Sequence, residues 1–160
     1  MSRDIFLHLR RAGVNDALDL LAWRNDPHTR AMSCNSDELK LEDHLAWFSR
    51  ALEDADRLIL IAEIQGEKVG MVRFDRRVLG WEVSVVVAAA CCGKGYGQAI
   101  LREGLVYLQT LANSPDVTAT VRLDNVASQR IFAHCGFHLV GSADGFDHLR
   151  WHGFPADKLH

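Results

Sequence analysis

Three glycines at alternate positions, Gly93, Gly95 and Gly97, lie between an apolar run and a segment with helical periodicity. Where a strand leads into a helix, the first backbone N–H groups of the helix have no partner within it, so the junction attracts anions. The glycine spacing differs from that of dinucleotide-binding loops, and Lys94 is not followed by the Ser or Thr of a nucleoside-triphosphate loop. The pattern therefore predicts a phosphate-binding turn, and a flexible strand-to-helix connection is the alternative interpretation.

Glu82 precedes this turn, near the start of the apolar run over residues 81–87. A carboxylate beside a bound substrate can accept a proton as a general base. The alternation of polar and apolar residues equally fits a solvated carboxylate on the strand face opposite Trp81 and Val83. From the residues alone, both interpretations of Glu82 stand.

Strands and helices alternate along the chain around these residues. Alternating or continuous apolar runs predict strands over residues 5–10, 58–64, 68–74, 81–87, 117–123, 138–141 and 146–151. Apolar stripes at helical spacing predict helices between Asn15 or Asp16 and Pro27, over 41–55, over 98–112, and from Asp124 or Asn125 to Cys135. Short connections containing Gly66 and Gly145 predict hairpins. These elements predict a mixed α/β fold.

The composition is that of an ordinary globular domain, which we expect to span residues 1–160. Hydrophobic residues make up 48% of the chain and charged residues 24%, which excludes disordered and low-complexity classes. A net charge of -3 argues against a nucleic-acid-binding surface. No apolar run approaches the roughly 20 residues needed to span a bilayer, and no signal-peptide core follows the first residues. We therefore expect a cytoplasmic protein without membrane association.

The four cysteines do not show the spacing of a metal site or of a disulfide framework. They are Cys34, Cys91, Cys92 and Cys135. We expect reduced, structural thiols, since free cysteine is usually buried. His148, Arg150 and His152 alternate on the last predicted strand, but no carboxylate or cysteine at ligand spacing accompanies them. We expect no metal there.

Two motifs resemble those of the GNAT acetyltransferase superfamily. The family's acetyl-CoA loop reads Arg or Gln, two residues, Gly, one residue, then Gly or Ala, and it falls on Cys92, Gly95 and Gly97, with Cys92 in place of Arg or Gln. A second family motif, Asn-x-x-Ser-x-x-x-Tyr-x-x-x-Gly-Phe, matches the run that begins at Asn125, with Phe132 in place of Tyr. The resemblance covers nearly the whole chain, most specifically residues 79–140. It implies one domain with a mostly antiparallel sheet flanked by helices.

The resemblance implies an N-acetyltransferase that uses acetyl-CoA as cosubstrate, with Glu82 as the general base. In such a site, the backbone of residues 85–87 pairs with the pantetheine arm, and an N–H near Val85 polarises the thioester carbonyl. Residues 93–97 bind the pyrophosphate, and Asn125 holds the pantetheine or caps its helix. The cofactor-binding residues that the resemblance implies are Val85, Val86, Val87, Cys92, Gly93, Lys94, Gly95, Tyr96, Gly97, Asn125, Ser128 and Phe132.

Phe132 departs from the family pattern because it occupies the position of a Tyr that protonates the departing sulfur. Phenylalanine has no proton to donate, but a thiol with a pKa of about 8.5 leaves tolerably as a thiolate. Tyr107, Cys135 or water are candidate substitutes. With Cys92, this departure also keeps open a non-catalytic module that binds acetyl-CoA.

The acceptor is indicated by the N-terminal helices. Residues 23–27 and 44–48 resemble a GNAT branch that includes aminosugar-nucleotide N-acetyltransferases of the pseudaminic acid pathway, and the first element also occurs in ribosomal-protein alanine acetyltransferases. This resemblance implies a primary amine on a nucleotide-linked amino sugar, or else a protein N-terminus or side chain, and a homodimer is a family-level expectation. The residues expected to line the acceptor site are Arg24, Arg30, His44, Trp47 and Arg73. The alternative for the aromatic residues is a place in the helix core.

Overall fold

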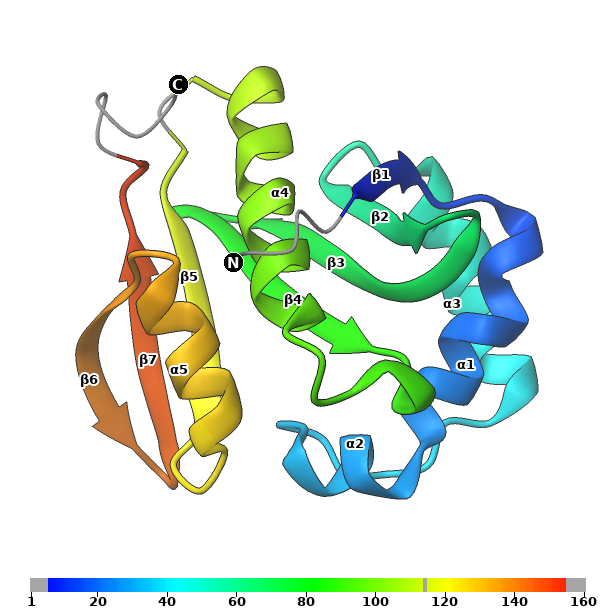
Figure 1. Ribbon diagram of the computed structural model, residues 1–160, viewed down its shortest axis with the longest axis horizontal. Helices are drawn as coiled ribbons and strands as arrows, with labels where there is room; N and C mark the ends of the chain where they lie inside the picture. The colour runs from blue at the N-terminus through cyan, green and yellow to red at the C-terminus, as the bar shows by residue number, and fades with distance from the viewer. Residues whose placement is uncertain (1–5, 114, 155–160) are drawn as a thin grey trace.

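In the computed structural model, which describes residues 6–113 and 115–154, seven strands form one sheet in the order β1-β2-β3-β4-β5-β7-β6 (Figure 1). The strands are β1 (Leu7–Arg11), β2 (Arg57–Ile64), β3 (Glu67–Arg77), β4 (Gly80–Val87), β5 (Val117–Arg122), β6 (His138–Ala143) and β7 (Phe146–Trp151). Every neighbouring pair is antiparallel except β4 and β5, which are parallel. The predicted mixed and mostly antiparallel α/β fold is confirmed.

Helices cover both faces of this sheet (Figure 1). They are α1 (Ala17–Asn25), α2 (Pro27–Met32), α3 (Leu41–Glu53), α4 (Tyr96–Leu111) and α5 (Val126–His134), with two short 3-10 turns, η1 (Val14–Asp16) and η2 (Ala89–Cys91). The larger core packs Leu101 and Leu105 of α4, together with Phe132 of α5, on one face. A smaller core packs Leu20 of α1 and Phe48 of α3 on the other. The central strands β2, β3 and β4 therefore have two buried faces over part of their length, which explains the continuous apolar runs in β2 and β4.

Two hairpins form where the sequence predicts them. Gln65 and Gly66 between β2 and β3, and Asp144 and Gly145 between β6 and β7, all have positive φ. Two successive residues with positive φ are the signature of the type I′ turn, which matches the twist of the strands it joins. The first predicted strand includes Ile5, which lies outside the described residues, and the turn predicted after α4 includes Ser114, which also lies outside them.

The helix predicted to stop before Pro27 ends at Asn25, as expected, but a second helix that the sequence analysis did not predict begins at Pro27 itself. Pro27 is the first residue of α2, where its missing N–H costs nothing and its fixed φ suits a helix. The Asp26 side chain caps this helix by accepting a hydrogen bond from the Thr29 N–H at 3.1 Å. A sequence scan that treats proline as a stop misses it, because the same residue that cannot continue one helix begins the next.

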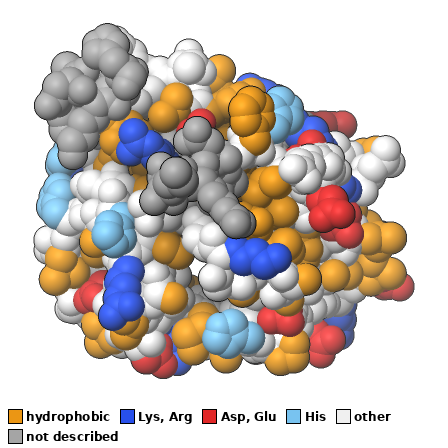
Figure 2. Space-filling view, in the orientation of Figure 1, with side chains coloured by type: hydrophobic (Ala, Val, Ile, Leu, Met, Phe, Trp, Pro, Cys, Tyr) orange, Lys and Arg blue, Asp and Glu red, His pale blue; other side chains and the backbone are white. Residues whose placement is uncertain are grey.

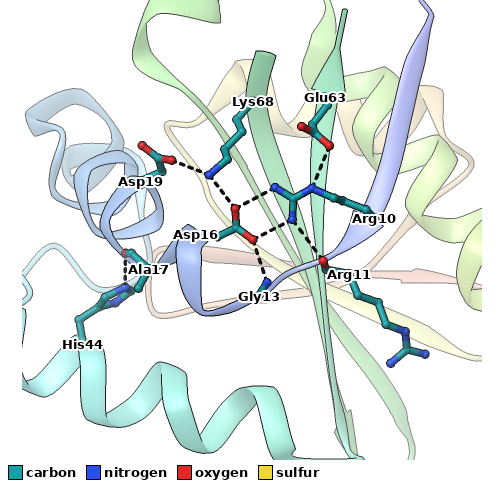
Figure 3. Close-up of polar contacts among 9 residues, drawn as sticks. All are labelled: Arg10, Arg11, Gly13, Asp16, Ala17, Asp19, His44, Glu63 and Lys68. Carbon is teal, nitrogen blue, oxygen red and sulfur yellow. Dashed lines mark hydrogen bonds and ion pairs between the residues drawn. The ribbon is translucent and has the colours of Figure 1, made fainter. Parts of the chain in front are cut away.

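A buried carboxylate ties η1 to the sheet (Figure 3). Asp16, only 1% exposed, accepts two hydrogen bonds from the Arg10 guanidinium at 2.8 and 2.9 Å and one from the Gly13 N–H at 2.8 Å. Lys68 of β3 lies 2.7 Å from the same carboxylate, and Glu63 of β2 holds the Nε of Arg10. The Arg10 guanidinium therefore holds the pKa of Asp16 well below its usual range. This network anchors the start of α1 against β1, β2 and β3.

The visible surface carries mixed charges. On the face drawn in Figure 2, basic, acidic and hydrophobic side chains are interspersed and the basic side chains lie in separate small groups. Over residues 6–113 and 115–154, no helix has both the length and the apolar character needed to cross a bilayer.

Candidate active site

The parallel strands β4 and β5 pair over only two positions and then separate. The paired positions are Trp81 with Val117 and Glu82 with Thr118. Beyond Glu82, β4 continues to Val87 with β3 as its antiparallel partner but without a register partner on β5. Backbone donors and acceptors along residues 83–87 therefore face an open edge within the sheet, of the kind to which an extended ligand adds like a strand.

Val85, Val86 and Val87 lie along this open edge. The side chain of Val86 is buried in the smaller core, whereas Val85 and Val87 are half-buried against the larger one. Their side chains thus fix the strand between two cores and leave its backbone to make polar contacts.

The glycine turn follows β4 and leads into α4. Gly93 and Gly95 both have φ of +80°, and a Cβ built on either would meet no atom within 4 Å. Gly95 is the N-cap of α4 and provides no side-chain cap, so the first N–H groups of the helix keep their hydrogen-bonding capacity. Cys92 and Lys94 are exposed beside the glycines. An uncapped helix terminus under an open, glycine-lined backbone fits a phosphate group.

Tyr96 and Gly97 have a different position because they begin the helix proper. Tyr96 is half-buried and packs against the larger core, and Gly97 is buried. A Cβ at Gly97 would lie 2.8 Å from the Cδ1 of Ile131 on α5. Gly97 therefore permits α4 and α5 to pack closely, and this role is separate from that of the turn.

The predicted C-terminal motif lies on α5. The Asn125 side chain caps this helix by accepting from the Ser128 N–H at 3.1 Å, and its amide donates to the Met32 carbonyl at 3.4 Å. Phe132 is 6% exposed and packs edge-to-face on Phe137 at 4.9 Å between ring centroids. Asn125 thus caps its helix and Phe132 packs in the core, as the alternative interpretations of the two residues expect.

Neither candidate substitute for the missing tyrosine hydroxyl is suitably placed. Tyr107 lies eleven residues along α4 from Tyr96, about 16 Å at the helical rise, and its hydroxyl accepts from Arg11 at 3.4 Å. Cys135 is buried and donates to the Gln98 carbonyl, and burial raises the pKa of its thiol to about 11. A thiol that is protonated and enclosed does not exchange protons readily with a ligand.

Glu82 lies at the point where β4 and β5 part. Its carboxylate is 39% exposed and its nearest cation among the described residues is Arg77, at 3.6 Å. Its Cα partners are Asp75 on β3 and Thr118 on β5, which place it on the sheet face covered by α1 and α3. Glu82 is therefore accessible to solvent and lies beside the open edge of β4.

A small cavity lies on the same face of the sheet, and the structure brings four of the five predicted acceptor-site residues to it. These are Arg24, His44, Trp47 and Arg73. The fifth, Arg30, does not line this cavity, and its Nε donates to the Ser36 carbonyl at 3.1 Å. Apolar residues that the sequence analysis did not single out complete the wall, namely Leu20, Leu39, Ile59 and Met71. Their apolar periodicity signals only core, so spacing does not distinguish a cavity wall from a filled interior.

His44 and Trp47 also belong to the packing of α3. His44 is 4% exposed, its Nε2 lies 2.8 Å from the Ala17 carbonyl, and its ring stacks on Phe48. Burial lowers the pKa of His44, so its imidazole is held neutral. Trp47 has the guanidinium carbon of Arg73 5.2 Å from its ring centroid. The helix-core alternative thus holds for both aromatic rings, although they also face the cavity.

The segment after α2 contacts the far half of the sheet. Cys34 donates from its Sγ to the Thr120 carbonyl of β5 at 3.4 Å, close to the Met32 contact with Asn125. Burial and the nearby Glu82 carboxylate raise the pKa of the Cys34 thiol. The expectation that the cysteines are buried is wrong for Cys34 and Cys92, which are exposed, and it is confirmed for Cys135. All four thiols are free, as expected.

Residues of the predicted histidine strand make hydrogen bonds and ion pairs. His152 lies 2.9 Å from Asp116, which also binds Arg150 at 2.8 Å, and the ring of His148 lies 3.5 Å from the Thr120 hydroxyl. Within the part of the chain that the structure describes, no group of three or more His, Cys, Asp or Glu side chains is arranged to hold a metal ion.

The fold of this chain is similar to that of several solved N-acetyltransferase structures. A spermidine N-acetyltransferase from Vibrio cholerae, in complex with CoA and spermine, superimposes with a TM-score of 0.79 at 17% identity, over 90% of this chain and 92% of that one. A candidate phosphinothricin N-acetyltransferase gives 0.76 at 26% identity, over 90% and 96%. A ribosomal-protein-alanine N-acetyltransferase from Brucella melitensis gives 0.75 at 24%, over 90% and 98%.

A search of curated protein sequences finds no match. The family model described as "Acetyltransferase (GNAT) domain" matches residues 7–138, a segment that contains β1 to α5 and therefore both the glycine turn and the strand that carries Glu82. Because this model covers most of the chain, the chain belongs to the GNAT family of acetyl-CoA-dependent N-acetyltransferases.

Proposed function

We propose that this protein transfers the acetyl group of acetyl-CoA to a primary amine, with Glu82 as the general base. The observation that supports this assignment most directly is the position of Glu82 at the end of the paired part of β4, where the open edge begins. A carboxylate there lies between a ligand on the β4 edge and the cavity lined by Arg24 and Arg73. It is also exposed enough to exchange its proton with solvent after each turnover.

In the proposed mechanism, residues 93–97 bind the pyrophosphate of acetyl-CoA and residues 85–87 hold the pantetheine arm through their backbone. Glu82 takes a proton from the ammonium group of the acceptor, directly or through one water, and frees the nitrogen lone pair. The nitrogen attacks the thioester carbon, while a backbone N–H near Val85 donates to the carbonyl oxygen as negative charge develops there. A carbon–nitrogen bond forms, the carbon–sulfur bond breaks, and the sulfur leaves with the electron pair. The acylated nitrogen then gives its second proton to water, so that a neutral amide remains.

Departure of the sulfur as a thiolate is consistent with Phe132. A thiol with a pKa of about 8.5 is a stable enough anion to leave without full protonation. Because Phe132 is packed in the core and Cys135 is enclosed, the proposed mechanism assigns protonation of the thiolate to water. We therefore infer a mechanism in which Glu82 is the side chain that transfers a proton.

As acceptor we propose a small primary amine, with a nucleotide-linked amino sugar as the leading candidate. Support comes from the cavity, where the aromatic face of Trp47 and the cationic groups of Arg24 and Arg73 lie together. Aromatic stacking and guanidinium contacts with phosphate suit such a ligand. A protein N-terminus is the alternative acceptor, and we expect the same base and the same cofactor contacts to act on it.

The test is release of the CoA thiol from acetyl-CoA with different amines. We expect release to depend on the amine and to be fastest with a UDP-linked 4-amino sugar, compared with an Ala-initiated peptide, spermidine and no acceptor. Faster release with the peptide would replace the sugar by a protein acceptor. Release that never exceeds the blank, although acetyl-CoA binds, would overturn catalysis in favour of a binding module.

A further inference from the structure

Arg24 is a charged side chain without a partner in the acceptor cavity. It lies in the last turn of α1, is half-buried, and makes no hydrogen bond or ion pair with another described residue. Arginine remains charged at all physiological pH values, so burying it without a counter-charge is unfavourable. The other basic residues around the cavity differ in this respect, because Arg73 binds Asp75 at 3.0 Å and Arg57 binds Asp54 at 3.3 Å.

The surroundings of Arg24 add positive charge. Arg73 lines the same cavity, and burial together with the Arg73 charge lowers the pKa of Arg24. Asp75, the buried carboxylate nearest to Arg73, is shared between Arg73 and Arg57, which lies 3.6 Å away. Asp75 and Asp54 thus compensate Arg73 and Arg57, and Arg24 adds a third guanidinium group that has no carboxylate of its own. This local excess of cations favours an anionic ligand.

Two contacts hold the guanidinium group of Arg73 at the cavity wall. Its guanidinium lies over the face of Trp47 and its Nε is occupied by Asp75, so its position is fixed on two sides. A fixed guanidinium opposite a second one forms a receptor for an oxyanion, because planar N–H donors match carboxylate and phosphate oxygens. The cavity volume of about 20 Å³ has room for one water-sized group, such as one oxygen of that anion.

The receptor lies close to the proposed base. Arg73 pairs in register with Ser84, and Ser84 is two residues from Glu82 along the same face of β4. At the rise of a strand, two residues span about 7 Å. An acceptor whose amine meets Glu82 and whose acidic group meets Arg73 is therefore a small molecule in which a few bonds separate the two groups.

We propose that Arg24 and Arg73 form a subsite for an oxyanion of the acceptor, a carboxylate or a phosphoryl group, and that this subsite selects acidic amines over polyamines. This inference rests on the proposed function for its link to catalysis, while anion binding itself does not require turnover. Spermidine carries only positive charges, so the two guanidinium groups repel it. The selectivity expected for this chain thus differs from that of the spermidine N-acetyltransferases with the same fold.

The binding test is thermal unfolding at pH 7 and constant ionic strength, with sodium acetate, sodium phosphate or sodium chloride added, each with and without CoA. The variants are Arg24→Gln, Arg24→Lys and the control Arg50→Gln, an exposed arginine on α3. We expect acetate or phosphate, but not chloride, to raise the Tm of the wild type and of Arg50→Gln. Arg24→Gln should lose at least tenfold in apparent affinity for that anion, and Arg24→Lys should retain part of it.

The anion that raises the Tm identifies the acidic group of the acceptor, because acetate carries a carboxylate and phosphate carries a phosphoryl group. The glycine turn also attracts phosphate, but it is unchanged in every variant and is occupied when CoA is present. Without anions, Arg24→Gln should unfold at a higher temperature than the wild type, since an uncompensated charge is removed. An equal anion response in wild type and Arg24→Gln, or a lower Tm for Arg24→Gln in plain buffer, would overturn the subsite.

A kinetic test separates this inference from the proposed function. For an acceptor with an acidic group, Arg24→Gln should raise the KM at least tenfold with little change in kcat, whereas the same acceptor as its neutral ester or amide should respond little to the substitution. Equal changes for both acceptors would contradict the subsite. If no amine supports transfer at all, the proposed function fails, while the anion titrations still decide whether the subsite exists.

Discussion

At the scale of single residues, what decides the chemistry is which carboxylate remains free to act. Asp16 and Asp75 are buried and held by arginines, so each is a structural anion. Glu82, by contrast, retains solvent access and has a distant partner, Arg77 at 3.6 Å. An exposed ion pair of this length contributes little to stability, about 0–1 kcal/mol, so replacing Glu82 probes function more than folding.

Replacement of Glu82 by Gln should lower kcat by about 10²-fold or more at neutral pH, because the amide has a similar shape but accepts no proton. The affinity for acetyl-CoA should remain nearly unchanged, since the glycine turn is untouched. The matched control is Arg77→Gln, which removes the partner but keeps the carboxylate, and it should retain most of the activity. The measurements are steady-state kinetics with pH and calorimetric titration of acetyl-CoA. An unchanged rate and pH profile in Glu82→Gln would remove Glu82 from the mechanism.

At the scale of elements, turns and caps set the positions of the functional groups. The hairpin turns and the start of α5 follow from local chemistry, since Gly66, Gly145 and Asn125 have the residue types that positive φ or an N-cap requires. Helix α2 does not follow from it as readily, because Pro27 carries the signal of a stop and of a start at once. The start of α4 differs from the start of α5, because its N-cap is a glycine without a capping side chain. The first N–H groups of α4 therefore remain free for a ligand.

Replacement of Gly95 by Val should abolish acetyl-CoA binding, because a branched side chain at the N-cap of α4 would occupy the space expected for the pyrophosphate. A φ of +80° also strains any branched residue, so a loss of stability alone must be excluded. Gly66→Val is the matched control, because Gly66 has the same φ and the same open surroundings in the distant β2–β3 turn. Both variants should lose similar stability, while only Gly95→Val loses binding in calorimetry. Normal acetyl-CoA binding by Gly95→Val would contradict the assignment of the turn.

The ion pairs of Asp16 make a contribution to the free energy of unfolding that decreases at low pH. Because Arg10, the Gly13 N–H and Lys68 hold the pKa of Asp16 below its usual value of about 3.9, the contribution is fully present above that pH and is lost as the pH falls further. Asp16→Asn should destabilise the fold by about 3 kcal/mol at pH 7, the lower end of the range for breaking a buried ion pair. Asp19→Asn, which alters an exposed partner of Lys68, should cost about 1 kcal/mol or less. Urea unfolding between pH 7 and pH 2 measures both, and a difference between wild type and Asp16→Asn that is as large at pH 2 as at pH 7 would contradict this origin.

At the scale of the whole molecule, much of the fold follows from the sequence, because each strand and helix has its own period, cap or turn. The separation of β4 from β5 cannot be predicted from the sequence. These strands lie on either side of α4 in the chain, and no local residue pattern determines how far they pair. The cavity is hidden for a related reason. Leu20, Ile59 and Met71 have the same apolar spacing whether they fill a core or leave a gap beside Arg24. The glycine turn can be predicted from the sequence because Gly93, Gly95 and Gly97 are nearly consecutive, whereas the role of Glu82 is implied by the resemblance and stays a prediction.

The two halves of the sheet share the larger core, and a ligand between β4 and β5 would add backbone hydrogen bonds to that packing. Only the register pairs at Trp81 and Glu82 join β4 to β5, so acetyl-CoA bound along residues 83–87 would satisfy backbone groups on the open edge. At a concentration 100 times its Kd, binding contributes about 2.7 kcal/mol, which corresponds to a rise in Tm of about 5–10 °C for a chain of this size.

Hydrogen exchange should locate this effect. CoA should slow exchange of the amides of residues 83–87 and of the glycine turn, because the pantetheine arm and the pyrophosphate reach different parts of the site. The fragment 3′-phospho-ADP, which lacks the pantetheine arm, should protect the turn but not residues 83–87. Equal protection of residues 83–87 by CoA and by the fragment would show that the open edge does not hold the pantetheine. In that case the proposed path of the acetyl group past Glu82 would fail with it, whereas selective protection would support a thioester end beside Glu82.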